Sequence, residues 1–413
     1  MFKRVAGTKD ILPEEVVYWQ KLEETSRSIF SLYNYREIRS PLIEEASLFD
    51  RSLGASTEIV QKQMFLIKNK EEAYALRPEA TASIVRAYIE NNLDKTAGFS
   101  KFFYIGAMFR LERPQKGRLR QFHHIGCEAI GSLDAYLDIE VISLADNLLK
   151  NFSIGGHKIK INTLGCAKDK KTLAVNLSNA LKAKVSDLCD ECRRRLKTNV
   201  LRILDCKNEP CQEIIRKLSV SHEHICPECK EHFNIVKEGL DSLKINYEVV
   251  PYLVRGLDYY TRTVFEISHQ DLGAQDALGA GGRYDNLVKE LGGPDLGAIG
   301  FAFGVERILL VTKPQCHKVT SKNLVYLISL GEQSKNEGLK ILHSLRSAGI
   351  ACDANYEGKS LKGAMRSAND AGARFVLIIG EDELKKGVVT LKDMSSSEQK
   401  EVKTEEIIKA LGC

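Results

Sequence analysis

Residues 255–266 contain the side chains best suited to binding a small anion. They read Arg-Gly-Leu-Asp-Tyr-Tyr-Thr-Arg-Thr-Val-Phe-Glu. The fork-shaped guanidinium of Arg255 can hold a carboxylate or a phosphate through two parallel hydrogen bonds. Tyr259 and Tyr260 offer flat walls with a hydroxyl at the tip. The stretch predicts a site for a small, polar, anionic substrate; the alternative is a core strand with a surface arginine.

Any nucleotide would have to be held by separate cations. The sequence has no G-x-x-x-x-G-K-[ST] phosphate loop, since Gly358-Lys359-Ser360 has Asp353 where the first glycine is needed. It also has no G-x-G-x-x-G run after a predicted strand. Arginines on strands and helices are therefore the candidate phosphate ligands. The foremost are Arg110, at the end of a strand, and Arg307, at the start of a helix.

The cysteine spacing indicates a metal site. Six of the eleven cysteines fall between Cys189 and Cys229, and the N-terminus has no apolar export signal, which favours a reducing compartment. Two C-x-x-C pairs are compatible with one four-thiolate zinc ion. We expect that structural Zn²⁺ to be bound by Cys189, Cys192, Cys226 and Cys229. Rival ligands are Cys206, Cys211, His222 and His224, and the alternatives to zinc are free thiols or a redox function.

Length and composition describe a multidomain protein without a membrane segment. A chain of 413 residues predicts two or three domains. No apolar run reaches the roughly 18–20 residues that cross a bilayer, so we expect a cytoplasmic protein. The net charge of +5 is concentrated in the middle: residues 170–247 hold 15 Lys or Arg and 11 Asp or Glu, whereas residues 323–413 hold 13 of each. A basic middle segment suits a polyanion, although a solvated surface would look the same.

Two strands joined by a basic loop are the main element expected to position these groups. Residues 102–110 and 125–131 read as the strands, and residues 111–120 as the loop. Such a hairpin can hold a polyanion; the alternative is a solvated charged loop. The other elements predicted in this half are a helix at 14–32, a strand at 35–43 and a helix at 79–91.

Beyond residue 169 the character of the chain changes. Residues 170–247 are basic, cysteine-rich and mostly helical, as in an insertion, and strand character resumes at 247–254. A Lys/Pro/Ser segment at about 312–322 is the predicted linker. Strands then alternate with helices, which predicts a small α/β domain with a mostly parallel sheet. Its strands are expected at 324–329, 350–354, 375–379 and 388–392.

These motifs resemble those of one enzyme family. Pro41, Arg110 with Glu112, and Arg307 after Gly304 resemble motifs one, two and three of class II aminoacyl-tRNA synthetases. Residues 255–266 resemble a signature of histidyl-tRNA synthetases. The resemblance extends over nearly the whole chain, through residues 7–13, 76–79, 110–126, 255–265, 281–285 and 300–307.

The resemblance implies both a fold and a division into domains. The fold class is α/β, with an α+β catalytic domain built on an antiparallel sheet flanked by helices. A mostly helical insertion and a C-terminal α/β anticodon-binding domain complete it. The expected parts are the first catalytic segment at 1–169, the insertion at 170–247, the second catalytic segment at 248–318 and the anticodon-binding domain at 323–413.

The resemblance also implies the activity of a histidine–tRNA ligase. Such an enzyme, a homodimer, uses ATP and Mg²⁺ to convert L-histidine to histidyl-adenylate and pyrophosphate, then transfers histidine to the 3′ end of tRNA-His. By the same resemblance Arg255 bridges the histidine carboxylate and the α-phosphate. The implied histidine contacts are Glu79, Thr81, Arg110, His124, Glu128, Arg255, Tyr259 and Tyr260. The implied ATP contacts are Arg110, Glu112, Phe122 and Arg307, with Arg110 and Arg255 catalytic, and Arg113 and Gln115 are the implied contacts to the tRNA acceptor end.

Two positions depart from the family pattern, and two other functions are alternatives. Ala80 stands where the family commonly has glycine. His124 stands where it usually has a glutamine that contacts the substrate, and His123 or His124 could instead be structural. One alternative function is the synthetase-like regulatory subunit of ATP phosphoribosyltransferase, which lacks the anticodon-binding domain. Another is a synthetase for proline or threonine, which conflicts with residues 255–266. Glu381 and residues 380–388 are the candidate anticodon contacts; the alternative there is a surface β-turn.

Overall fold

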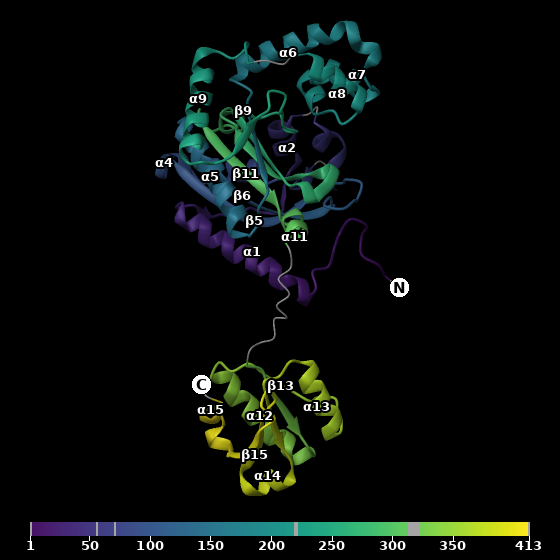
Figure 1. The fold of residues 1–413 in the computed structure, drawn as a ribbon, viewed down its shortest axis with the longest axis vertical. Helices are drawn as coiled ribbons and strands as arrows, with labels where there is room; N and C mark the ends of the chain where they lie inside the picture. Colours follow the sequence, from purple (N-terminus) through teal and green to yellow (C-terminus); the bar gives the residue numbers. More distant parts are fainter. Residues whose placement is uncertain (1, 55–56, 70–71, 219–221, 313–322, 412–413) are drawn as a thin grey trace. The chain divides into compact units, whose positions relative to one another are not determined.

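The computed structural model describes residues 2–54, 57–69, 72–218, 222–312 and 323–411. Contacts divide the chain into two units, Met1–Pro314 and Gln315–Cys413, each of which is described by itself (Figure 1). Beyond Thr312, the predicted linker lies outside the described residues. Within the described ranges, no helix is both long and apolar enough to cross a bilayer.

A mostly antiparallel sheet forms the centre of the first unit. Its strands are β1 (Arg36–Glu37), β5 (Ser100–Phe109), β6 (Gln121–Ile130), β7 (Lys158–Thr163), β8 (Tyr247–Val249), β9 (Thr261–Ser268), β10 (Ala277–Arg283) and β11 (Ala298–Gly304). They pair in the order β1-β5-β6-β11-β10-β9-β7-β8. The edge pairs β1–β5 and β7–β8 are parallel, and the pairs between them are antiparallel. The predicted antiparallel sheet flanked by helices is thus confirmed.

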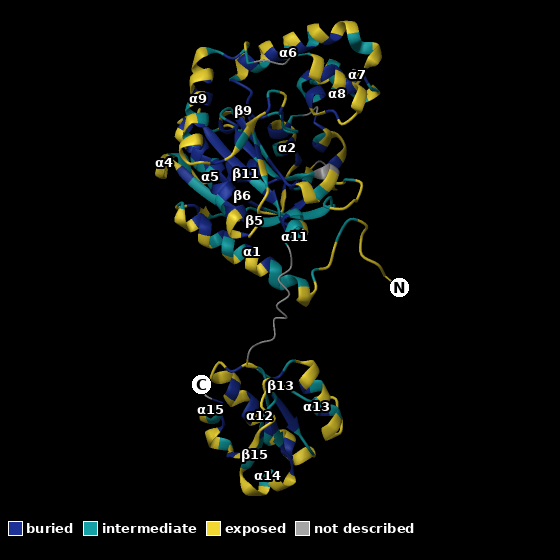
Figure 2. Cartoon of the chain, in the orientation of Figure 1, coloured by how far each residue is buried: buried dark blue, intermediate teal, exposed yellow. Residues whose placement is uncertain are grey.

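Alternation along the strands separates a core face from a pocket face. On β6, Ile125 and Cys127 pack into a core with α1 (Pro13–Leu32), α5 (Ala135–Asn151), α9 (Pro227–Ser242) and α11 (Val305–Val311). The neighbouring residues His124 and Glu128 face the other way, because successive side chains of a strand point to opposite faces. Figure 2 shows that the central strands are largely buried.

A second, smaller sheet contributes to the core on the pocket face. Its strands β2 (Ile43–Glu45), β3 (Phe65–Asn69) and β4 (Glu72–Leu76) pair in the order β2-β4-β3. The helices that accompany them along the chain are α2 (Ala46–Leu53), η1 (Ile59–Gln63), α3 (Thr81–Glu90), α4 (Leu93–Thr96) and, much later, α10 (Leu287–Glu290). Phe49 of α2 and Val85 of α3 are fully buried in this core.

The described chain between β7 and β8 is helical, as predicted for the insertion. It holds α6 (Ala167–Leu181), η2 (Lys182–Asp187), α7 (Asp190–Thr198), η3 (Val200–Asp205), α8 (Glu209–Lys217) and α9. The last of these, α9, packs in the main core with α5. Gly239 lies so close to Ile139 that an added Cβ would be 2.1 Å from its Cδ1. The returning helix is therefore part of the body that carries the sheet.

The second unit is a five-stranded sheet with helices. Its strands are β12 (Val325–Ser329), β13 (Cys352–Ala354), β14 (Phe375–Ile379), β15 (Val388–Asp393) and β16 (Gln399–Lys403), in the order β13-β12-β14-β15-β16. Its helices are α12 (Glu332–Ser347), α13 (Leu361–Asp370), α14 (Glu381–Lys386) and α15 (Ile407–Ala410). The prediction of a mostly parallel sheet is wrong in part, since β14–β15 and β15–β16 are antiparallel.

Two local predictions and one alternative interpretation differ from the structure. The strand expected at 35–43 is broken: β1 ends at Glu37 and β2 begins at Ile43, because Pro41 has no N–H for a ladder. The strand expected at 247–254 ends at Val249, two residues before Pro251. Residues 381–386 form α14 rather than a β-turn, and Gly387 follows it with φ +66°.

Candidate functional site

A pocket of about 200 Å³ opens on the middle strands of the eight-stranded sheet. Eleven side chains predicted from distant parts of the sequence line it together. They are Glu79, Thr81, Arg110, Glu112, Phe122, His124, Glu128, Arg255, Tyr259, Tyr260 and Arg307. Arg113 and Gln115 instead lie exposed in the loop between β5 and β6. The structure thus brings the predicted substrate contacts into one place and leaves the predicted tRNA contacts outside it.

Small residues on β11 create the hollow. Gly300, Ala302 and Gly304 line the pocket, while Ile299 and Phe303 point into the opposite core. A Cβ added to Gly300 would lie 2.0 Å from Oε2 of Glu128. Glycine at this position is therefore required for the Glu128 carboxyl group to occupy its place.

One end of the pocket is acidic and fully desolvated. Oε1 of Glu128 accepts a hydrogen bond from the Thr81 hydroxyl at 2.7 Å, and Oε2 accepts one from the Tyr284 hydroxyl. Glu79 accepts the backbone N–H groups of Thr81 at 2.7 Å and Ala82 at 2.9 Å, which ties it to the start of α3. Both carboxyl groups are held in place by their partners, so the pocket is preorganised for a cation.

Burial raises the pKa values of both acids. It raises the pKa of Glu128 to about 8, against the effect of the Thr81 and Tyr284 donors. Burial also raises the pKa of Glu79, although the backbone donors at Ala82 and Thr81 oppose the shift. A cation entering this end would restore the charged form of Glu128, because an opposite charge favours ionisation.

Aromatic hydroxyls surround the acidic end. The rings of Tyr259 and Tyr260 are 4.7 Å apart, and those of Tyr259 and Tyr284 are 5.7 Å apart in an edge-to-face arrangement. Burial raises the pKa of Tyr260 to about 12, so its hydroxyl stays protonated. The group offers neutral hydrogen-bonding tips inside an apolar wall, which suits a planar polar ring.

Arg255 lines the pocket as a permanently charged group. Its Nη1 donates to Oε2 of Glu266 at 2.6 Å. Burial works against the charged form, but the Glu266 carboxylate more than compensates and raises the pKa of Arg255. Its Nε is buried and has no hydrogen-bond partner among the described residues. Since a buried guanidinium N–H without a partner is costly, this atom is available to an anionic ligand.

Arg110 and Arg307 supply two further cations. Nε of Arg110 donates to the carbonyl of Pro78 at 2.9 Å, and its guanidinium lies 5.3 Å from the centre of the Phe122 ring. Arg307 donates to the carbonyls of Gly117 at 2.9 Å and Ala277 at 2.7 Å. Burial lowers the pKa of both arginines. Both guanidinium groups are held by backbone carbonyls, which leaves their charge available to a ligand.

The two adjacent histidines do different things. His123 lies on the core side, where its Nδ1 is 2.9 Å from Oε1 of Glu306 and its ring packs edge-on against Trp19. His124 lines the pocket, and burial, together with the charges of Arg110 and Arg307, lowers its pKa well below the ordinary value. Its buried Nδ1 has no partner among the described residues. His123 thus packs against Trp19 and contacts Glu306, whereas His124 presents its imidazole to the pocket.

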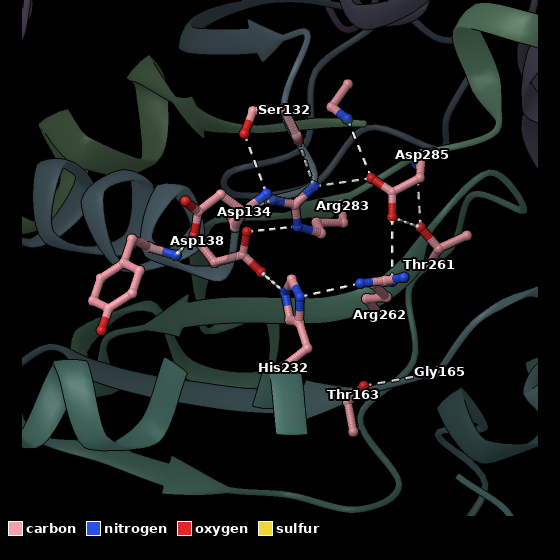
Figure 3. Close-up of polar contacts among 12 residues, drawn as sticks. Ser132, Asp134, Asp138, Thr163, Gly165, His232, Thr261, Arg262, Arg283 and Asp285 are labelled. Atoms are coloured by element: carbon pink, nitrogen blue, oxygen red, sulfur yellow. Dashed lines mark hydrogen bonds and ion pairs between the residues drawn. The ribbon is translucent and has the colours of Figure 1, made fainter. Parts of the chain in front are cut away.

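A buried polar network holds the strands that carry the site (Figure 3). Arg283, which is 0% exposed, donates to Asp138 at 2.6 Å and to Asp285 at 2.9 Å. It also donates to the carbonyls of Ser132 and Asp134. The second oxygen of Asp138 is 2.8 Å from Nε2 of His232 on α9. Strand β10 is thereby tied to α5 and to the returning helix.

The network continues to the strand that follows the tyrosines. Nδ1 of His232 lies 3.2 Å from Nη1 of Arg262, which has φ +43° in β9. Arg262 also donates to Glu228 at 2.6 Å and lies 3.7 Å from Asp285. Residues far from the pocket thus fix the backbone from which Tyr259 and Tyr260 project.

The predicted zinc ligands do not form one group. Cys189 and Cys192 lie with Cys206 and Cys211, while Cys226 and Cys229 lie with Cys166 and Asp169. The prediction of one site from both C-x-x-C pairs is therefore wrong. The physical reason is that the first pair begins α7 and the second begins α9, and each meets a different partner segment.

Tyr104, Tyr284 and Glu306 line the pocket although the sequence predicts no function for them. The two tyrosines line the acidic end, and Glu306 holds His123. Arg118, which belongs to the basic loop predicted to contact ATP and the tRNA acceptor end, joins the other arginines. Arg118 forms an ion pair with Glu112 across the loop. Tyr284 falls within residues 281–285, which resemble the family, so the sequence could have identified it as a pocket residue. Tyr104 has no such resemblance and looks like an ordinary core aromatic residue.

Comparison with known proteins matches the chain from end to end. A family model described as "Histidyl-tRNA synthetase" matches residues 7–308, and one described as "Anticodon binding domain" matches residues 324–413. The histidine--tRNA ligase of Halothermothrix orenii is 43% identical over 412 residues, covering 99% of this chain and 98% of that protein. That of Thermosipho melanesiensis is 44% identical over 411 residues, covering 99% and 98%.

A solved structure agrees with these matches. The apo histidyl-tRNA synthetase of S. aureus superimposes with a TM-score of 0.80 at 32% identity, covering 100% of both chains. A Bacillus halodurans structure titled as an ATP phosphoribosyltransferase regulatory subunit/histidyl-tRNA synthetase gives a TM-score of 0.65 at 23% identity, covering 92% of this chain and 98% of that one. The second likeness shows the fold alone.

Proposed function

The chain belongs to the histidyl-tRNA synthetase family, and on that premise we propose how its pocket performs the reaction of a histidine–tRNA ligase. The enzyme activates L-histidine with ATP to histidyl-adenylate and pyrophosphate, then transfers histidine to the 3′ end of tRNA-His. One observation carries the proposal at the level of residues. Four arginines, among them Arg110, Arg255 and Arg307, line the same 200 Å³ pocket as the imidazole of His124 and two buried carboxyl groups.

Histidine is assigned to the acidic end. Its α-ammonium would be accepted by Glu79 and Glu128, and its imidazole would hydrogen-bond to the hydroxyls of Tyr259 and Tyr260. Selectivity arises because an amino acid without ring nitrogens would leave buried polar groups unpaired. His124, with its unpartnered Nδ1, takes the position of the family's usual glutamine and can still accept a hydrogen bond from the substrate.

ATP is assigned to the arginine end. The carboxylate of histidine must attack the α-phosphate, and two anions repel each other. Preorganised cations offset this repulsion most strongly as charge develops on the transferring group. Arg255 would bridge the carboxylate and the α-phosphate, Arg110 and Arg307 would hold the other phosphates, and the adenine would stack on Phe122.

Mg²⁺ is the usual companion of ATP and neutralises phosphate charge when it is bound. It is normally held by one or two carboxylates together with substrate phosphates. Glu112 fits this requirement, since it lines the pocket among the arginines and pairs with Arg118. A phosphate that attracts Arg118 would release this carboxylate for the ion.

The tRNA contacts are assigned to exposed groups. Arg113 and Gln115, in the loop between β5 and β6, would contact the acceptor end. The second unit, which matches the anticodon-binding family, would bind the anticodon, with Glu381 and residues 380–388 as candidate contacts. A homodimer is also proposed: Leu42 and Ile43, beside Pro41, are 45% and 50% exposed, as expected for an apolar surface that a second copy covers. The enzyme would act in the cytoplasm.

The regulatory-subunit alternative is not favoured. Full-length relatives at 42–44% identity are named histidine--tRNA ligases. The anticodon-binding unit is present. Arg110, Arg255 and Arg307 all line the pocket, which a protein that only senses histidine would not need.

An exchange assay tests the proposed function. Purified protein is incubated with ATP, labelled pyrophosphate and each of the twenty amino acids in turn. Histidine alone should support exchange, and tRNA-His alone should then be charged. Exchange with another amino acid, or none with any, would overturn the assignment.

Histidine binding should release a proton at pH 7. With a pKa of about 8, Glu128 is mostly protonated in the empty pocket, and the α-ammonium favours the ionised form. Affinity should therefore rise with pH, and the release should disappear, as the pH passes through 8. Calorimetric titrations in two buffers of different ionisation enthalpy would measure close to one proton per histidine.

Glu128→Gln provides the control for this titration. It cannot ionise and should bind histidine without proton release, at whatever reduced affinity. An equal release in the variant would show that another group, such as Glu79, is responsible.

A further inference from the structure

Four cysteines outside the pocket form a compact group of sulfur atoms. Cys189, Cys192, Cys206 and Cys211 constitute this four-cysteine group, and their Sγ atoms all lie within 4.8 Å of one another. The Sγ atoms of Cys189 and Cys206 are 3.9 Å apart. Sulfurs arranged tetrahedrally around Zn²⁺ at about 2.3 Å would be about 3.8 Å apart. A disulfide would need about 2.0 Å. The spacing therefore fits one ion and not a covalent bond.

Local structure explains why the sulfurs meet. Cys189 is the N-cap of α7, Cys192 is its third residue, and Cys211 is the third residue of α8. Cys206 immediately follows η3. The positive end of a helix favours thiolate over thiol, and two helix ends are aimed at the same point.

Backbone donors support the sulfurs from outside. The N–H of Cys189 donates to Sγ of Cys211 at 3.3 Å, and the N–H of Asn208 donates to Sγ of Cys206 at 3.4 Å. Donors of this kind orient metal ligands and carry part of the thiolate charge. All four cysteines are free thiols, and Cys192 and Cys211 are fully buried.

Hydrophobic packing contributes little to the position of α7: apart from Cys189 and Cys192, only the partly buried Leu196 packs against the core. Of its nine residues, only Cys192 is buried, and three consecutive arginines follow it. An isolated helix of this length is marginal in water, so it needs tertiary contacts. Metal–thiolate bonds from Cys189 and Cys192 would strengthen the attachment that the single apolar contact of Leu196 provides.

We propose that the four-cysteine group binds one tetrahedral Zn²⁺ ion. Four soft sulfur ligands at this spacing suit zinc, and a site with all positions filled by protein is structural rather than catalytic. The ion would clamp α7, η3 and α8 together. Two of these segments, α7 and η3, also line a cavity of about 550 Å³ whose lining includes Arg110 and Arg255, so the ion would fix a wall next to the proposed active site.

The other sulfur group provides a contrast. Cys166, Asp169, Cys226 and Cys229, the aspartate group, also lie together. The carboxylate of Asp169 accepts the N–H of Cys166 at 3.1 Å and that of Cys226 at 3.2 Å, one on each oxygen. Asp169 thus already caps two helix starts, and the proposal does not include this group. Cys226 provides a control for the loss of a thiol outside the four-cysteine group; like Cys189, it is the N-cap of a helix within a C-x-x-C pair.

The first test measures metal content. The full chain, expressed with sufficient zinc, is analysed beside Cys206→Ser, Cys226→Ser and Cys352→Ser, the last altering a cysteine of the second unit. Cys206→Ser should lose about one equivalent relative to the wild type, and Cys352→Ser none. If Cys226→Ser also loses a separate equivalent, the aspartate group is a second site and the first assignment stands. A wild type with little zinc, or an unchanged Cys206→Ser, overturns the proposal, as does a single ion lost equally in Cys206→Ser and Cys226→Ser.

The second test identifies the ligands and guards against simple unfolding. Co²⁺ in place of Zn²⁺ should give thiolate charge-transfer bands of a tetrahedral four-sulfur site. Cys206→His, which keeps a ligand, should retain one ion with a shifted visible spectrum. Chelation of the wild type should speed amide exchange in residues 189–211 while α12 is unaffected. Unchanged exchange, or Cys206→His without metal, contradicts the clamp.

Discussion

Arg255→Ala should slow the formation of histidyl-adenylate by about 100-fold or more. Losing one preorganised donor to a developing anion typically costs that much. Arg255 is partly buried and charged, it lines the pocket, and its buried Nε has no hydrogen-bond partner among the described residues. Single-turnover measurement of adenylate formation at saturating histidine and ATP isolates this step from binding. A rate within threefold of the wild type would exclude the bridging role.

Two variants separate charge from geometry in this experiment. Arg255→Lys keeps the charge but not the fork, so it should fall between the wild type and Arg255→Ala. Arg39→Ala removes an arginine whose side chain is 76% exposed, and it should leave the rate unchanged. If Arg255→Lys equals the wild type, a point charge is sufficient and the bidentate bridge is wrong.

Arg283→Ala should lower the free energy of unfolding of the first unit by about 3–5 kcal/mol, the usual cost of removing one partner of a buried ion pair. Arg283 is 0% exposed and forms ion pairs with Asp138 and Asp285. Removing it leaves Asp138 buried with only His232. Urea denaturation monitored by fluorescence reports on this unit, because Trp19 is the one tryptophan in the sequence.

Arg27→Ala is the matched control for stability. Its side chain is 38% exposed and pairs with Glu23 and Glu37, so its loss should cost no more than about 1 kcal/mol. Equal losses for the two variants would mean that the buried network of Figure 3 contributes no more than a surface pair.

The convergence of the arginines could be predicted from sequence, whereas the grouping of the cysteines could not. Arg110, Arg255 and Arg307 belong to motifs whose order along the chain implies a shared pocket. A C-x-x-C pair at a helix start supplies only half of a tetrahedral site. Either Cys206 with Cys211 or Cys226 with Cys229 could complete a site that begins with Cys189 and Cys192, and the spacing in the sequence does not decide between the two pairs.

Long-range partners also explain the other differences. Asp138, His232 and Arg283 come from segments far apart in sequence, and each alone looks like a surface charge or a helix residue. The strands β3 and β16 are largely exposed, so they lack the apolar alternation that identifies a strand. Pro41 does mark the end of the strand expected at 35–43, because proline has no N–H for a ladder, but the earlier end at Glu37 carries no such signal.

The packing of α9 limits how much of the helical insertion could be replaced without disturbing the catalytic body. Exchanging α6 to α8 for another module would leave this core in place, because none of their described residues belongs to it. A graft that also replaced α9 would remove part of the core and expose Asp138. In relatives with a shorter or longer insertion, the length should therefore vary before Pro227, and α9, which begins there, should be kept. The boundary between the variable part of the insertion and the catalytic body therefore lies at the start of α9 and not at the end of the insertion.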